Sequence, residues 1–128
     1  MAEVCVFLAE GFEEIEGLTV VDLLRRAGID TVTAAVGDKV CVTGSHGIRV
    51  EADCLLEQAK AGEADLLVLP GGMPGTKNLA ACGALTELLK KSEGRGQRVA
   101  AICAAPSVLG ELGLLEGKKA VCYPGFEE

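Results

Sequence analysis

Short apolar runs alternate with stretches of helical periodicity, and this alternation restricts the possible folds more than any other feature of the chain. The runs cover residues 4–9, 31–35, 65–69 and 98–102. Each has the length of a strand buried on both faces. Strands that alternate with helices need right-handed crossover connections, which produce a mainly parallel sheet. The chain is therefore predicted to be an α/β protein with a mainly parallel sheet.

The segments between these runs complete the expected order of elements. Apolar residues recur at helical spacing over three stretches, and a glycine follows each of them. These stretches are residues 20–27, 79–91 and 104–112. Residues 40–43 and 48–50 flank a Gly-Ser-His-Gly turn, which predicts a hairpin at a sheet edge. Asp53 is expected to cap a short helix running towards Lys60, and residues 119–122 are expected to begin another strand.

Composition excludes several classes of protein. The 128 residues, of which 49% are hydrophobic, suit one domain with a core, and the apolar runs are too short to span a membrane. A net charge of −7 and an aromatic content of 3% argue against nucleic-acid binding. The six cysteines form no CxxC pair, and the chain has one histidine, so no metal site is expected. Without a signal peptide, the chain is expected to be cytoplasmic with reduced thiols.

The turn from the fourth apolar run into the following helix contains the strongest candidate for a reactive residue. Cys103 lies at this corner, and Pro106 stands where the first helical turn tolerates a missing N–H. Helix N-termini carry unpaired amides and a positive dipole, so we expect the Cys103 thiol to ionise more easily than usual. The serine form of this arrangement is the nucleophile elbow of hydrolases. The alternative is a small cysteine buried in the core.

Two loops are expected to lie beside Cys103, because ligands bind at the carboxyl ends of parallel strands. In the loop after residues 65–69, Gly71 and Gly72 expose backbone amides of the kind that form an oxyanion hole; the alternative is an ordinary turn. In the acidic loop after residues 4–9, Glu13 and Glu14 are expected to stabilise a helix N-terminus. Apolar neighbours flank Glu16, which favours a carboxyl that keeps its proton and bonds a nearby thiol.

Three motifs together resemble the ThiJ/PfpI family, in its parkinsonism-protein or protein deglycase branch. They are Leu-Pro-Gly-Gly at 69–72, Ala-Ala-Ile-Cys-Ala-Ala-Pro at 100–106 and Gly-Phe-Glu-Glu-Ile-Glu at 11–16. The resemblance implies a flavodoxin-like three-layer sandwich and a homodimer that needs no cofactor. It makes Cys103 the nucleophile and Glu16 its protonated hydrogen-bond partner. The site residues it implies for binding the substrate oxygen are the backbone amides of Gly71, Gly72 and Ala104.

The implied activity is that of a cysteine-dependent glyoxalase or deglycase acting on methylglyoxal-type aldehydes or their early adducts. The alternative within the family is an oxidative-stress sensor or chaperone in which Cys103 becomes a sulfinic acid. Ala104 stands where the protease-like branch has histidine, so peptide hydrolysis is disfavoured. Tyr123 stands where many relatives have histidine. His46 is expected to be a surface or interface residue and not a base.

The resemblance covers residues 1–128 as a single domain, whereas family members continue for roughly another third. The sheet is therefore expected to lack a strand and to leave apolar surface uncovered. One hypothesis is that the chain is the N-terminal fragment of a longer protein, cut after Glu128, with the cleaved C-terminal segment still bound. The other is a naturally short chain whose homodimer covers the gap.

Overall fold

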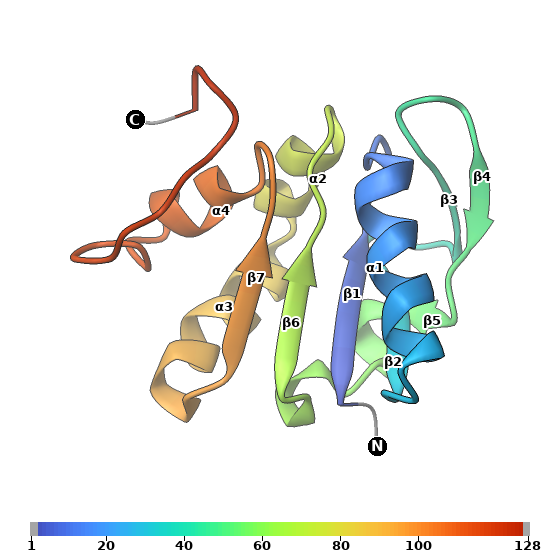
Figure 1. Cartoon of the computed structure of the whole chain (residues 1–128), viewed down its shortest axis with the longest axis horizontal. Helices are drawn as coiled ribbons and strands as arrows, with labels where there is room; N and C mark the ends of the chain where they lie inside the picture. The colour runs from blue at the N-terminus through green and yellow to red at the C-terminus, as the bar shows by residue number, and fades with distance from the viewer. Residues whose placement is uncertain (1–2, 127–128) are drawn as a thin grey trace.

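The computed structural model describes residues 3–126 and contains a five-stranded sheet in which every pair of neighbouring strands is parallel (Figure 1). The strand order is β5-β2-β1-β6-β7. The strands are β1 (Val4–Leu8), β2 (Thr31–Ala35), β5 (Cys54–Leu55), β6 (Leu66–Leu69) and β7 (Arg98–Ala101). The four predicted strands are confirmed to within one residue at each end, which agrees with the parallel α/β architecture.

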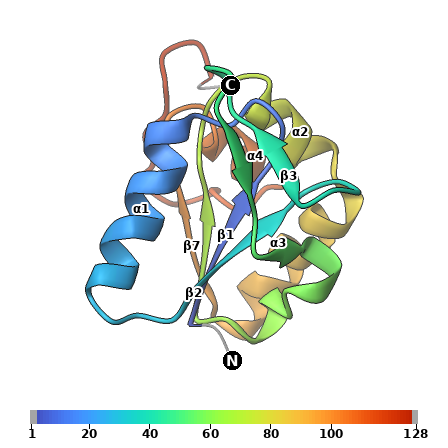
Figure 2. The same cartoon turned by 90° about the vertical axis from the view of Figure 1, so that its right-hand side faces the viewer.

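Helices lie on both faces of the sheet and make three layers (Figure 2). They are α1 (Glu14–Arg26), α2 (Gly75–Ala81), α3 (Gly83–Arg95) and α4 (Pro106–Glu111), with short 3₁₀ turns at Leu56–Gln58 and Ala61–Glu63. Helix α1 covers one face, and α2, α3 and α4 pack on the other. Among residues 3–126, no helix has the length and apolar character needed to cross a membrane.

The alternation of side chains along β1 divides the core into two parts. Val6 and Leu8 pack towards α1 together with Phe12, whereas Cys5 and Phe7 pack towards α2, α3 and α4. These β1 residues are almost completely buried. A strand with apolar residues on both faces needs cover on both sides, which explains why the run at residues 4–9 lies at the centre of the sandwich.

The predicted hairpin forms, but it does not join the central sheet. Strands β3 (Cys41–Thr43) and β4 (Arg49–Glu51) pair antiparallel with each other as a separate two-stranded sheet. The buried Val42 packs into the core on the α1 side. The prediction of a hairpin at a sheet edge is therefore wrong in its placement, because contact with α1 and β1 holds the hairpin over the sheet.

The predicted cap at Asp53 is also wrong. The Asp53 carboxylate accepts hydrogen bonds from the backbone N–H and the hydroxyl of Thr33, at 2.9 and 3.1 Å, and from the Arg25 guanidinium at 2.6 Å. These bonds tie the segment to β2, and the next two residues become β5. The expected helix is reduced to the 3₁₀ turn at Leu56–Gln58.

The expected helix over 79–91 is two helices, because the backbone at Cys82 is extended between α2 and α3. Residues 119–122 form no strand, which corrects that prediction. No ladder hydrogen bonds reach them among the described residues, and strand propensity without a pairing partner does not make a strand. The expected cut after Glu128 lies outside the described residues.

Strand β7 is the edge of the sheet, and one of its faces is open. Arg98 and Ala100 are exposed, as is half of Ile102, the residue that follows the strand. Helix α1 lies on this same face of the sheet but packs over β1 and β2, which β6 separates from β7. The expectation that this sheet leaves apolar surface uncovered is confirmed for residues 3–126.

Candidate active site

The acidic loop and the Pro-Gly-Gly loop are joined at the carboxyl edge of the sheet. The Glu13 N–H donates to the Gly71 carbonyl at 2.9 Å, and the Gly75 N–H donates to the Gly11 carbonyl at 3.1 Å. A side chain on Gly72, whose φ is +99°, or on Gly75 would collide with the backbone of residues 11–13. Glycine at these positions therefore allows the two loops to pack backbone against backbone.

Cys103 lies at the corner between β7 and α4 in a strained backbone conformation. Its φ is +61°, and Lys60 is the other non-glycine residue with a positive φ in the described chain. Pro106 occupies the first turn of α4, as predicted. The Ala104 N–H donates to the Cys103 sulfur. A strained residue between a strand and a helix projects its side chain out of the corner, which is the geometry of a nucleophile elbow.

Gly71 brings Glu16 and Cys103 together. The Gly71 N–H donates to Glu16 Oε1 at 2.9 Å. A Cβ built on Gly71 would lie 2.5 Å from that oxygen, 2.7 Å from Cys103 Cβ and 2.8 Å from the Ile102 carbonyl oxygen. Glu16 also hydrogen-bonds the Cys103 thiol. These three residues come from segments far apart in the sequence, and the structure places them in one cluster.

The Cys103 thiol does not ionise more easily than an ordinary cysteine, which corrects the sequence-based expectation. Burial raises its pKa, and the negative charge of Glu16 raises it further. The Ala104 N–H favours the thiolate and lowers the pKa, but this effect is smaller. The helix N-terminus therefore acts in the predicted direction and is outweighed by burial and by the neighbouring carboxylate. Loss of the Glu16 charge would remove the larger of the two charge effects, from Glu16 and Glu13, that raise the Cys103 pKa.

The remaining predicted site residues lie around this cluster. Ala104 is buried, and its amide faces the thiol. The amide of Gly71 is already donated to Glu16, so it holds the acid in place. The Tyr123 N–H donates to the Cys103 carbonyl at 2.7 Å, while the Tyr123 side chain is exposed and stacks edge-on against Phe126. The C-terminal segment therefore touches the elbow through its backbone.

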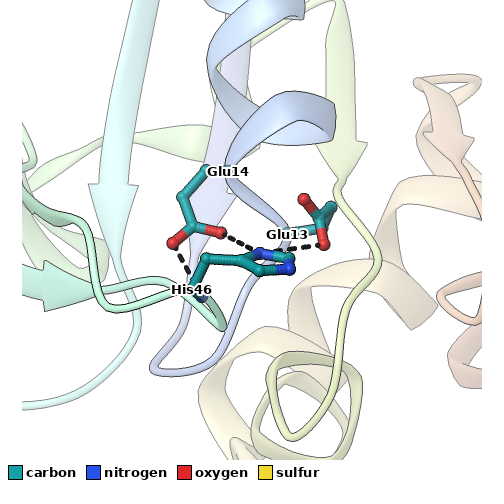
Figure 3. A group of neighbouring side chains, drawn as sticks. All are labelled: Glu13, Glu14 and His46. Carbon is teal, nitrogen blue, oxygen red and sulfur yellow. Dashed lines mark hydrogen bonds and ion pairs between the residues drawn. The ribbon is translucent and has the colours of Figure 1, made fainter.

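Sequence reasoning missed the contact between Glu14 and the hairpin turn (Figure 3). The buried Glu14 carboxylate accepts from the backbone N–H groups of His46 and Ile48, at 2.9 and 3.2 Å, and contacts His46 Nδ1 at 3.0 Å. These hydrogen bonds lower the Glu14 pKa to about 2 in spite of burial. Glu14 and the Glu13 charge raise the pKa of His46. His46 itself is exposed, as predicted for a surface residue.

Fold and site together define a class. The protein is an α/β sandwich with a parallel sheet and a cysteine at a nucleophile elbow, with a carboxyl group against the thiol. Within this class the chain belongs to the DJ-1/PfpI family, because the model of that family matches residues 2–128.

Individual relatives agree with this assignment. Protein DJ-1 homolog B of Arabidopsis thaliana is 44% identical over 127 residues, which are 98% of this chain and 29% of the plant protein. A protein named deglycase from Pyrococcus abyssi is 32% identical over 98% of this chain and 74% of its own length. The structure of oxidized Toxoplasma gondii DJ-1 matches with a TM-score of 0.93 and 43% identity, over 98% of this chain and 69% of that one. The chain thus spans less than a third of the plant relative.

Proposed function

We propose that the protein is a cysteine-dependent glyoxalase or deglycase that acts on methylglyoxal-type aldehydes or their early adducts. The observation that carries the proposal is the cluster of Gly71, Glu16 and Cys103 at the carboxyl edge of the sheet. A thiol beside a carboxyl group supplies both the nucleophile and the proton carrier that this chemistry needs. The deglycase name of the Pyrococcus relative supports the same reaction class.

The first step joins the Cys103 sulfur to the aldehyde carbon of methylglyoxal. The thiol proton passes through Glu16 to the aldehyde oxygen, so a neutral hemithioacetal forms. The resemblance assigns the amides of Gly71, Gly72 and Ala104 to the developing oxyanion. Because the Gly71 N–H donates to Glu16, the amides of Gly72 and Ala104 are the ones left for this role. The raised pKa of the thiol fits this sequence, because the proton leaves as the carbon–sulfur bond forms and no standing thiolate is required.

The second step moves hydrogen between the two substrate carbons. Glu16 removes the proton from the former aldehyde carbon, and the resulting enediol takes a proton at the neighbouring carbon to give a lactoyl thioester on Cys103. Water then hydrolyses the thioester, which releases lactate and restores the thiol. The reaction is an internal redox exchange between two carbons of one substrate, so it consumes no external oxidant or reductant.

Lactate production from methylglyoxal tests the proposal. We expect the protein to form lactate, Cys103→Ala to form none, and Glu16→Gln to lose most of the rate. Chiral analysis of the D- and L-lactate would show whether Glu16 delivers the proton to one face. Turnover that persists in Cys103→Ala would refute the role of Cys103 as nucleophile. The absence of turnover in the unaltered protein would refute the proposed enzymatic activity.

A second candidate function uses the same thiol as an oxidation sensor. Two observations favour it: Glu16 lies where it can hydrogen-bond a sulfinic acid on Cys103, and the Toxoplasma relative is described as oxidized. A sensor requires Cys103 to react before the other thiols under mild peroxide. Peptide mass spectrometry after graded peroxide treatment measures this order. Equal oxidation of Cys103 and the exposed Cys41 would contradict the sensor role.

A further inference from the structure

A cluster of nitrogen and oxygen donors lies beside the elbow and takes no part in the proposed reaction. Glu13 and Glu14 stand at the start of α1, and His46 stands in the turn between β3 and β4 (Figure 3). Ser45 precedes His46 in the same turn. A nitrogen of His46 and one carboxylate oxygen from each glutamate lie within 4.8 Å of one another. The cluster joins two segments about 30 residues apart, so no local motif in the sequence indicates it.

The donor atoms have the spacing of a small tetrahedron. His46 Nδ1 lies 3.0 Å from Glu14 Oε1 and 3.5 Å from Glu13 Oε2. Ser45 Oγ lies 3.2 Å from that nitrogen, 3.3 Å from Glu13 Oε2 and 3.4 Å from Glu14 Oε1. Zinc bonds to nitrogen and oxygen of about 2.0–2.1 Å require tetrahedral edges of about 3.3–3.4 Å. Five of the six edges therefore lie within a few tenths of an ångström of the required length.

The Glu14 carboxylate is fixed before any ion arrives. Its Oε2 accepts from the N–H groups of His46 and Ile48, which leaves Oε1 directed at the imidazole. Only 6% of the Glu14 side chain is exposed, compared with 67% of the His46 side chain. A rigid buried ligand opposite an exposed one gives a prepared site with an open path from solvent.

The negative charge of the two carboxylates also favours binding of a cation. Buried carboxylates are normally paired with a positive group or bound to a metal. Within the described part of the chain, the ion pairs of Glu13 and Glu14 are both made with His46 and neither involves lysine or arginine. Two carboxylates thus share one imidazole. A divalent cation on a neutral imidazole would balance both charges.

We propose that Glu13, Glu14 and His46 bind Zn²⁺, with the Ser45 hydroxyl or a water molecule at the fourth corner. An imidazole nitrogen and short tetrahedral edges favour zinc over magnesium and calcium, which prefer six or more oxygen ligands at longer distances or in octahedral geometry. The ion replaces the proton on His46 Nδ1, and that proton passes to solvent. The site is separate from Cys103, so its existence does not depend on the proposed function.

His46 is the one histidine in the chain, which makes its imidazole a direct probe of the site. We would titrate the full chain with ZnCl₂, measure affinity and stoichiometry by calorimetry, and follow the two ring nitrogens by ¹⁵N NMR. The expected result is one zinc per chain and a change of the Nδ1 resonance that saturates with the same stoichiometry. A ring that stays unperturbed while zinc binds, or the absence of binding, would overturn the proposal.

Variants distinguish this site from binding at the six free cysteines, because thiolates are also zinc ligands. Glu13→Gln and His46→Ala change exposed or partly exposed side chains, and each should weaken binding at least tenfold. Glu10→Gln is the matched control, because Glu10 is a neighbouring acid outside the cluster whose carboxylate accepts from the Thr43 N–H. The zinc affinity of this variant should stay within twofold of that of the unaltered chain. Co²⁺ in place of zinc should show no thiolate charge-transfer band. Such a band, or equal affinity in His46→Ala, would assign the metal to cysteine and refute the proposal.

Discussion

Replacement of Gly71 by alanine tests the packing that unites the candidate active site. The added methyl carbon would lie 2.5–2.8 Å from Glu16 Oε1, Cys103 Cβ and the Ile102 carbonyl oxygen, where ordinary contacts are 3.4–4 Å. Overpacking of this kind costs about 1–3 kcal/mol, and a weakened hydrogen bond to a charged carboxylate costs about 1.5–3 kcal/mol. A small gain from the less flexible unfolded chain, about 0.4–1 kcal/mol, offsets part of this.

The expected net loss in the free energy of unfolding is about 1.5–5.5 kcal/mol, and the melting temperature should fall by about 6–22 °C for a chain of this size. Urea titration and calorimetry measure both quantities. Gly94→Ala is the matched control, because a Cβ there meets nothing within 4 Å and the residue lies inside α3. It should raise stability by up to about 1 kcal/mol. A Gly71→Ala protein as stable as the Gly94→Ala protein would refute the packing described for Glu16 and Cys103.

Three further predictions concern the core, the hairpin turn and the thiol. Phe12→Ala should cost about 3–5 kcal/mol in urea titration, because the ring is almost fully buried in the α1-side core; a loss below 1 kcal/mol would contradict that burial. Glu14 stabilises the fold above its unfolded pKa near 4.5, and this contribution is lost as pH falls towards 2. His46 has a raised pKa in the folded protein, so its contribution is present below about 6.5 and is lost as pH rises through the folded-state pKa of His46. Melting curves from pH 2 to 9 should show both losses, and His46→Ala should abolish the upper one. Glu16→Gln removes the charge that raises the Cys103 pKa, so the pH midpoint of iodoacetamide alkylation should fall; an unchanged midpoint would show that Glu16 does not act on the thiol.

The parts of the fold that the sequence predicts are those governed by local pattern. Residues 31–35 form the predicted strand without change, and Pro106 begins the predicted helix, because strand burial and helix N-termini leave signals within a few residues. The errors occur where pairing or long-range contact overrides propensity. Asp53 suits a helix cap, yet Thr33 and Arg25 take its carboxylate. Residues 119–122 look like a strand, yet no described strand pairs with them.

The candidate site divides in the same way. The elbow at Cys103 and the glycine loop could be placed at one sheet edge from the order of strands alone. The raised pKa of the thiol could not, because it depends on how deeply the thiol is buried and on its distance from Glu16. The direction of the helix dipole was predicted correctly, but its competition with a carboxylate from another loop was not.

The amino-acid sequence by itself determined a parallel α/β sandwich with a cysteine at the turn from strand to helix, because period, chain direction and turn chemistry are local properties. Tertiary structure decided which charged groups meet. Glu14 was indistinguishable in sequence from its acidic neighbours, yet it is the one that is buried against the hairpin turn, where its carboxylate accepts from the N–H of His46, 32 residues away. Electrostatic energies depend on distance and burial, and both are fixed only when the segments pack together.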